Sequence, residues 1–348
     1  MNKRTEKLLG CMSRMGIDNI LITDPKNMYY FSGFYQGEGY LIIGKAGFIL
    51  ATDSRYTEYA VNTCTDFEVK DITKVKISDF ISDGESLGFE DEFVTYAYYK
   101  NLSEKVPCLV GASGLIRDLR EVKDDIEIEY IKKAVEISDM AFSHICSYIK
   151  EGMTEKEVSA EIDCFMKKNG AESSSFSTIV AAGERGSLPH ALPSDRQLKK
   201  GDFVVMDFGA VYMGYLSDMT RTVAVGETDG EKRKVYETVL SAQLKALSEI
   251  KAGVKACDVD RCARDYIDSL FPDTFGHSLG HSVGLDIHES PNLSPKNIKE
   301  LESGNVVTVE PGIYIPGFCG VRIEDMVIVR DKKAEILTCS PKELIYVG

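Results

Sequence analysis

Two aspartates near the middle of the chain are spaced so that they could share a proton or a cation. The apolar run Phe203–Met206 ends at Asp207, and a glycine-containing turn precedes Asp218. A hairpin centred between Tyr212 and Met213 would make Asp207 and Asp218 direct cross-strand partners, with Cβ atoms about 4.5–5.5 Å apart. Two carboxylates at that distance repel each other unless a proton or a cation lies between them. Solvated turn aspartates are the alternative, and the apolar run before Asp207 argues against it.

A second pair of carboxylates has the same pattern. Val306–Val309 leads into Glu310, and Val321–Ile323 leads into Glu324. If the intervening loop is centred on Gly317, the two glutamates face each other across a hairpin. Four carboxylates gathered in one apolar cavity need compensating positive charge. A pair of divalent cations would supply it.

The histidines are concentrated in one short segment. The chain has five, and three of them, His277, His281 and His288, lie among glycines that allow close approach of the backbone to a ligand. An isolated histidine such as His144 is more often a structural residue. One imidazole combined with four carboxylates makes an oxygen-rich site, which favours Mn²⁺, Co²⁺, Fe²⁺ or Zn²⁺ over a thiolate-type centre.

The elements expected before these residues alternate between helix and strand. Apolar spacing and turn residues predict a helix over 3–15, strands at 19–22, 40–43, 48–51 and 87–89 and near 69, and a helix opened by 53–56. Residues 111–114 are expected to form a loop, and residues 117–125 are a dense charge cluster. We therefore predict a domain boundary there, with one domain over 1–118 and a second over 119–348.

The second part of the chain begins with helical patterns and then repeats itself. Residues 128–149 carry apolar side chains at alternating steps of three and four, and Thr154 with Glu157 predicts a capping box for a helix to Gly170. The pattern of residues 150–166 recurs over 251–267, and that of 201–209 recurs over 304–312. We infer two related halves, each with two helices followed by strands.

Five ordered motifs together resemble the signature set of the pita-bread metallopeptidases, which include aminopeptidase P, prolidase and methionine aminopeptidase. The motifs lie at residues 205–209, 217–222, 280–289, 308–314 and 320–325. Residues 27–34 and 52–56 resemble the creatinase-type N-terminal domain. The resemblance implies an α/β fold, with a creatinase-like N-terminal α/β domain followed by a duplicated pita-bread catalytic domain.

The resemblance also implies a role for each site residue. Five would be metal ligands, and two of these would bridge both ions: Asp207, Asp218, His281, Glu310 and Glu324, with Asp218 and Glu324 bridging. Glu310 would also accept a proton, and His288 would stabilise the oxyanion. Four residues would line the substrate pocket or support the ligands: His190, His277, His288 and Arg322.

The activity implied is that of a dinuclear metallopeptidase acting at the N-terminus of a peptide with proline in the second position. A hydroxide between two divalent ions, expected to be Mn(II) with Co(II), Fe(II) or Zn(II) as alternatives, would attack the scissile carbonyl. An Xaa-Pro dipeptidase (prolidase) is the main alternative, and Asn292, where some prolidases have Arg, favours longer peptides. A methionine aminopeptidase shares the metal ligands but normally lacks this full N-terminal domain. A creatinase-like amidinohydrolase and a non-catalytic pita-bread module fit less well, because all five ligand positions are intact.

Composition limits the partners and the compartment. The formal net charge of −14 argues against nucleic acid as a partner, and the sequence has no stretch of ~20 apolar residues. Nine cysteines without a spacing framework suit a reducing cytoplasm. The resemblance implies a homodimer in which an exposed aromatic-rich segment of the N-terminal domain borders the partner's pocket. The residues of this segment are Tyr29, Tyr30, Phe31, Phe34, Tyr35 and Tyr40, of which Tyr30 and Phe31 are expected to pack in the domain's own core.

Overall fold

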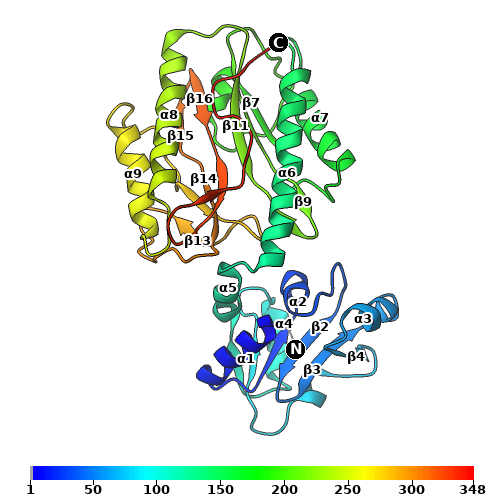
Figure 1. The fold of residues 1–348 in the computed structure, drawn as a ribbon. Helices are drawn as coiled ribbons and strands as arrows, with labels where there is room; N and C mark the ends of the chain where they lie inside the picture. Colours follow the sequence, from blue (N-terminus) through cyan, green and yellow to red (C-terminus); the bar gives the residue numbers. More distant parts are fainter. Residues whose placement is uncertain (1–2) are drawn as a thin grey trace. The chain divides into compact units, whose positions relative to one another are not determined.

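A computed structural model describes residues 3–348, which form two compact units that divide between Arg120 and Glu121 (Figure 1). The predicted boundary after residue 118 falls inside helix α5 (Ser113–Glu121). The prediction of a loop over residues 111–114 is wrong. Gly111 ends strand β6 (Leu109–Gly111), where it pairs with Phe89, and α5 begins two residues later because Leu115 and Ile116 supply a buried apolar face.

The N-terminal unit is a single six-stranded sheet with helices packed on it. The strand order is β4-β3-β2-β1-β5-β6. Its other strands are β1 (Asn19–Ile22), β2 (Tyr40–Gly44), β3 (Gly47–Thr52), β4 (Glu68–Asp71) and β5 (Leu87–Phe89). Its other helices are α1 (Lys3–Met15), α2 (Pro25–Ser32), α3 (Thr57–Thr63), the 3₁₀ turn η1 (Ile77–Phe80) and α4 (Tyr96–Ser103). The helices and strands expected before residue 90 are confirmed.

The aromatic-rich segment of this unit is mostly buried. The expected burial of Tyr30 and Phe31 is confirmed, and the exposed surface expected at Phe34 and Tyr40 is wrong. Four of its six rings are in the core: Tyr30, Phe31, Phe34 and Tyr40. The glycine at position 37 makes room for a ring rather than flexibility, because a Cβ there would lie 2.1 Å from Phe34 Cε1. Only Tyr29 and Tyr35 are partly exposed, and their rings pack together with centroids 4.8 Å apart.

The second unit contains two main sheets covered by four helices (Figure 1). The helices are α6 (Asp125–Tyr148), α7 (Glu155–Lys168), α8 (Gly230–Glu249) and α9 (Ala256–Asp268), with the 3₁₀ turn η2 (Gly183–Ser187). The first sheet has the order β19-β11-β8-β7, with β7 (Ile179–Ala182), β8 (Phe203–Phe208), β11 (Met219–Val225) and β19 (Tyr346–Val347). Its hairpin extension is β9 (Val211–Tyr212) with β10 (Tyr215–Leu216).

The second sheet has the order β13-β12-β14-β17-β18. Its strands are β12 (Gly280–Ser282), β13 (Glu289–Leu293), β14 (Val306–Val309), β17 (Asp325–Ile328) and β18 (Glu335–Ile336). The accompanying hairpin is β15 (Gly312–Ile315) with β16 (Cys319–Arg322). In each half, one sheet strand thus leads into a short hairpin: β8 into β9–β10, and β14 into β15–β16.

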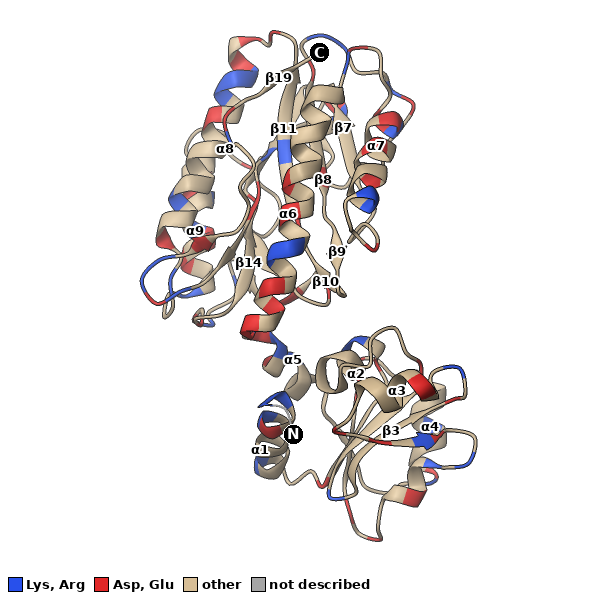
Figure 2. Ribbon diagram, turned by 45° about the vertical axis from the view of Figure 1, so that its right-hand side comes forward, with Lys and Arg blue, Asp and Glu red and all other residues tan. Residues whose placement is uncertain are grey.

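The helical predictions for this unit are confirmed. The apolar stripe of α6 is buried, and the Thr154 hydroxyl accepts from Glu157 N while the Glu157 carboxylate accepts from Thr154 N, which closes the expected capping box. Acidic and basic residues are interspersed along α6 and α8 (Figure 2). No helix within residues 3–348 is long and apolar enough to cross a membrane.

The internal repeat is visible in the backbone hydrogen bonds. In each half, the glycine before the second helix and the glycine before the strand that leads into the hairpin (β8 or β14) donate equivalent backbone bonds of 2.7–3.0 Å. The bonds are Gly152 N to Leu198 O and Gly253 N to Leu301 O, and Gly201 N to Val225 O and Gly304 N to Val329 O. Because the second bond of each pair repeats the first about 100 residues further along the chain, the duplication is confirmed at the level of local structure.

Candidate metal centre and active site

The first hairpin brings Asp207 and Asp218 together, but not as direct partners. The structure pairs Asp207 with Thr220, so the predicted register is wrong by two residues. The turn lies at Met213 and Gly214, whose φ angles of 48° and 75° are both positive, as a tight two-residue hairpin turn requires. Because side chains alternate along a strand with a period of two, this shift does not move either aspartate to the opposite face.

The second hairpin has the register expected from its sequence. Gly312 pairs with Arg322 in the β15–β16 ladder, which places the centre of the loop at Gly317. The β14–β17 ladder continues the same register, with Val309 opposite Asp325. Glu310 and Glu324 occupy the gap between these two ladders. A carboxylate just outside a ladder is free of strand pairing and can be directed by its surroundings.

Three of the predicted ligands form a tight cluster. One ligand atom from each of Asp218, His281 and Glu324 lies within 4.8 Å of the others. His281 Nε2 is 3.5 Å from Asp218 Oδ2 and 3.4 Å from Glu310 Oε1. Asp218 directly precedes β11, His281 lies in β12, and Glu310 and Glu324 adjoin the same end of the β14–β17 ladder, so both halves of the unit contribute.

Asp207 joins the cluster through an arginine. Arg322, whose side chain is 3% exposed, donates from Nη2 to Asp207 Oδ2 at 2.6 Å and from Nε to Thr220 Oγ1 at 2.9 Å. Thr220 in turn donates to Glu324 Oε2 at 2.7 Å. Among the described side chains, Asp207 Oδ1 and Glu324 Oε1 are buried without any hydrogen-bond partner. Unpartnered anionic oxygens at the centre of a carboxylate cluster fit bound divalent cations.

The electrostatics of the cluster point the same way. Burial, followed by repulsion from neighbouring carboxylates, raises the pKa of Asp218 and the pKa of Glu324 well above their usual values. Burial raises the pKa of Glu310 to about 8, against the opposing influence of Arg322. Burial, assisted by His288, lowers the pKa of His281 to about 4, so this imidazole is neutral and can act as a ligand. Divalent cations would relieve the carboxylate repulsion.

The remaining histidines surround this cluster. The His288 ring packs edge-on against His281, with centroids 4.4 Å apart. His277 Nε2 lies 2.9 Å from the Tyr314 hydroxyl, and burial followed by the Arg322 charge lowers the pKa of His277 to about 4. His190 is exposed on the segment after η2, and its charge also contributes to the lowered pKa of His277. The structure therefore brings all the predicted site histidines to one region.

Several residues that hold the site were not identified from the sequence. Thr308 Oγ1 accepts from His281 N at 3.0 Å, and Met326 Sδ accepts from Asp218 N at 3.1 Å. The Tyr314 hydroxyl accepts from Arg322 Nη1 at 2.9 Å. Thr308 and Tyr314 lie in the motif at residues 308–314, so their closeness to Glu310 in the sequence could have identified them as neighbours of the site. Nothing local to Met326 marks it as a neighbour of Asp218.

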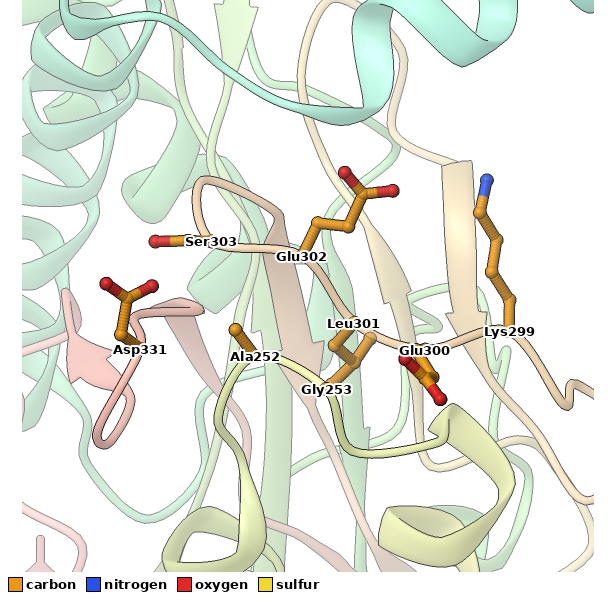
Figure 3. A pocket seen from close by; sticks show the side chains of 8 residues that line it. All are labelled: Ala252, Gly253, Lys299, Glu300, Leu301, Glu302, Ser303 and Asp331. Atoms are coloured by element: carbon orange, nitrogen blue, oxygen red, sulfur yellow. The ribbon is translucent and has the colours of Figure 1, made fainter.

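A separate surface hollow of about 720 Å³ lies where the α8–α9 connection faces the segment before β14 (Figure 3). Its lining includes Gly253, Lys299 and Asp331, and none of the predicted site residues. Opposite charges line it without converging on one point, as Figure 3 shows for Lys299 and Asp331. This hollow is therefore not part of the carboxylate and histidine site.

Comparison with known proteins places the whole chain in one family. Residues 129–331 match metallopeptidase family M24, and residues 4–122 match the creatinase/prolidase N-terminal domain. The structure named Xaa-Pro dipeptidase from Bacillus anthracis is 43% identical, with a TM-score of 0.95 over 99% of both chains. The X-Pro aminopeptidase structure from Thermotoga maritima is 38% identical, with a TM-score of 0.92 over 99% of this chain and 100% of that one.

A sequence relative gives the same result. The Xaa-Pro dipeptidase of Pyrococcus furiosus is 41% identical over 350 residues, covering 99% of this chain and 100% of its own length. The pita-bread fold with a creatinase-type N-terminal domain is thus confirmed, and so is a hydrolase of the peptidase class. The chain belongs to metallopeptidase family M24 and carries the creatinase/prolidase N-terminal domain.

Proposed function

We propose that the protein is a metal-dependent exopeptidase that hydrolyses the Xaa-Pro bond at the N-terminus of peptides, in the manner of aminopeptidase P. The observation that carries this proposal is the convergence of acidic side chains from both halves of the catalytic unit, with Asp207 Oδ1 and Glu324 Oε1 left unpartnered. The names of the similar proteins, Xaa-Pro dipeptidase and X-Pro aminopeptidase, support the substrate class.

Each site residue has a distinct task in this proposal. Two divalent ions would be held by Asp207, Asp218, His281, Glu310 and Glu324, with Asp218 and Glu324 shared. Such ions lower the pKa of a bound water and polarise a carbonyl oxygen. Glu310 accepts the proton released during attack, and its buried position makes it an effective base. His288 donates a hydrogen bond to the carbonyl oxygen as negative charge develops there. Arg322 holds Asp207 in place.

The metal is proposed to be Mn(II). Four carboxylates and one imidazole form a hard, oxygen-rich donor set, which supports Mn(II) and also accommodates Co(II), Fe(II) or Zn(II). Elemental analysis of protein purified without added metal identifies the ion that the site retains. Reloading the metal-free protein with each ion in turn then ranks them by turnover.

Peptides longer than two residues are the proposed substrates. A strict dipeptidase needs a cation for the substrate's terminal carboxylate, most often an arginine. Asn292 instead accepts hydrogen bonds from Ser294 and Asn297 within its own turn. The three arginines that contact the segments of His190, His277 and Asp207 already donate to carboxylates and backbone carbonyls: Arg185, Arg264 and Arg322.

The prolidase reading is the second candidate, because two of the similar proteins carry that name. Assays of Xaa-Pro against Xaa-Pro-Yaa-Zaa, at equal metal loading, separate the two. We expect a higher kcat/KM for the tetrapeptide, and Xaa-Ala peptides serve as the matched control for proline. A preference for the dipeptide would favour prolidase, whereas equal hydrolysis of the Xaa-Ala peptides would contradict proline specificity altogether.

A homodimer and a cytoplasmic location complete the proposal. Phe93 and Tyr96 on the N-terminal unit are 51% and 79% exposed, which supports a protein contact on that unit. Light scattering measures the mass in solution, and Tyr96→Lys is expected to shift it toward the monomer. All nine cysteines are free, which suits a reducing compartment. Localisation of the tagged full chain by fractionation tests this.

A further inference from the structure

Lys123 is a buried lysine that was not among the predicted site residues. Its side chain is 1% exposed, and its Nζ donates to Ser282 Oγ at 2.8 Å and to Glu289 Oε2 at 2.9 Å. Both partners are more than 150 residues further along the chain. A buried ammonium is costly unless it is paired and hydrogen-bonded, so this arrangement is specific rather than incidental.

The backbone that carries Lys123 is fixed to the segment that leads into β14, the central strand of the second sheet. Lys123 N donates to Gly304 O at 3.0 Å, and Asn305 Nδ2 donates to Glu121 O at 3.0 Å. These bonds hold the lysine's Cα beside the start of β14. Strand β14 pairs with β12, and Ser282 lies in that β12–β14 ladder. The lysine is therefore anchored beside β14, which pairs with β12, the strand that carries His281.

The turn that Lys123 contacts has no regular structure of its own. Residues 283–288 connect β12 to β13 without a strand or helix assignment. The Glu289 carboxylate accepts the backbone hydrogen bonds that a neighbouring strand would otherwise accept. Its Oε1 accepts from Leu285 N at 3.0 Å and from Asp286 N at 3.1 Å. A Cβ at position 284 would lie 2.6 Å from Glu289 Oε2, so a larger residue there would displace this carboxylate.

The two residues that Lys123 holds are the sequence neighbours of two site histidines. Ser282 follows His281, and Glu289 follows His288. Residues 283–288 connect the two histidine segments, and the two rings lie 4.4 Å apart between centroids with 71° between planes. We propose that Lys123 is a positioning residue for His288: its ammonium neutralises and anchors Glu289, which fixes turn 283–288 and hence the His288 ring relative to His281. The effect on turnover rests on the proposed peptidase function.

The decisive variant removes both charges of the pair. Lys123→Met alone would leave the Glu289 carboxylate buried without its cation and can prevent folding. The double variant Lys123→Met/Glu289→Gln removes the ion pair without leaving an unpaired charge. We expect kcat on an Xaa-Pro peptide to fall ~10–100-fold, as is usual for loss of an outer partner of a site residue, with KM changed less than about threefold and the metal content of the parent.

A direct readout of the rings comes from NMR. With only five histidines in the chain, ¹⁵N-histidine labelling of the metal-free protein gives a simple ring spectrum. We expect the double variant to shift the ring signals of His288 and His281, assigned from single His→Gln variants, and to leave those of His144 in place. Lys299→Met is the matched control, because it breaks the neighbouring ion pair with Glu121 and does not touch turn 283–288.

The outcomes separate this inference from the proposed function. Unmoved His288 signals in the folded double variant would overturn the positioning role whatever the activity. If the double variant shifts these signals but the parent protein hydrolyses no Xaa-Pro peptide, the positioning role stands and the proposed substrate is wrong. If the double variant does not fold, Ser282→Ala removes one contact of the Lys123 ammonium and keeps the ion pair. It must still shift the His281 signals.

Discussion

Arg322 donates to Asp207 at 2.6 Å and so joins β16, in the second half of the catalytic unit, to β8 in the first. The pair is almost fully buried, with side chains 3% and 13% exposed. The positive charge that pairs with Asp207 therefore comes from the other half of the duplicated domain. Arg322 leaves one oxygen of Asp207 unpartnered.

Replacing this arginine should destabilise the metal-free protein more than the loaded one. Arg322→Met leaves Asp207 as a buried charge without its cation, which typically costs about 3–5 kcal/mol. Bound divalent ions would supply part of the missing positive charge, so urea unfolding should show a smaller loss with metal present. Lys132→Met is the control, because its pair with Glu335 is exposed and its loss should cost less than about 1 kcal/mol. Equal losses for the two variants would refute the role of Arg322.

Loss of either proposed bridging carboxylate should empty both metal sites. Asp218→Ala and Glu324→Ala each remove a ligand that the two ions are proposed to share, so elemental analysis should find far less than one ion per chain in either variant. Asp195→Ala, at an exposed surface ion pair, provides the control and should retain the parent content. Two tightly bound ions in either bridging variant would contradict the assignment.

His288 is expected to act on the reaction and not on metal binding. His288→Ala should reduce turnover by ~10²–10³, the usual effect of removing one hydrogen-bond donor to a developing oxyanion, while the metal content stays that of the parent. His144→Ala, which removes a histidine paired with Glu161 on the surface of the helices, should leave turnover unchanged. Loss of metal from the His288 variant, or undiminished turnover, would rule out this role.

The pKa of Glu310 predicts a pH dependence of the metal-free fold. Burial raises this pKa to about 8 from an ordinary 4.5, so the folded state retains a proton that the unfolded state releases between these values. Stability contributed by this group is therefore lost as the pH rises from about 4.5 to 8. Glu310→Gln imitates the protonated form. It should raise the melting temperature of EDTA-treated protein more at pH 8 than at pH 5.

The exposed Glu302 provides the control for that measurement. Glu302→Gln removes a solvated carboxylate, so its melting temperature should follow that of the parent at both pH values. An equal gain at pH 5 and pH 8 for Glu310→Gln would show that the carboxyl does not change its protonation in this window.

The segment that carries His190 depends on a buried glutamate. Glu155 is fully buried, and its carboxylate accepts from Ala182 N at 2.8 Å, from Ser194 N at 2.9 Å and from Arg185 Nε at 3.0 Å. Glu155→Ala leaves these donors without an acceptor, which costs about 1–3 kcal/mol of folding free energy for each buried group. Trypsin should then cleave after Arg185 faster than in the parent. Glu157→Ala removes only the capping box of the same helix and should change this cleavage little.

The local elements follow from the sequence because their causes are local. The stripe of α6, the Thr154–Glu157 cap and the loop centred on Gly317 depend on residues within a few turns or strand positions of one another. The carboxylates and histidines could also be named before the structure was known, since their spacing in ordered motifs indicates metal chemistry. The metal-ligand roles themselves remain predictions that the experiments above test.

Tertiary structure alone decided the rest. The hairpin register at Asp207 depends on a left-handed Met213, an uncommon conformation for a side chain of that size. The Phe34 ring is buried and packs against Tyr56 and Tyr59, which lie more than 20 residues further along the chain. Lys123 bonds to Glu289, which lies 166 residues further along the chain. Such contacts join residues far apart in the chain, and their energies exist only once burial has removed water from both partners, so no local pattern records them.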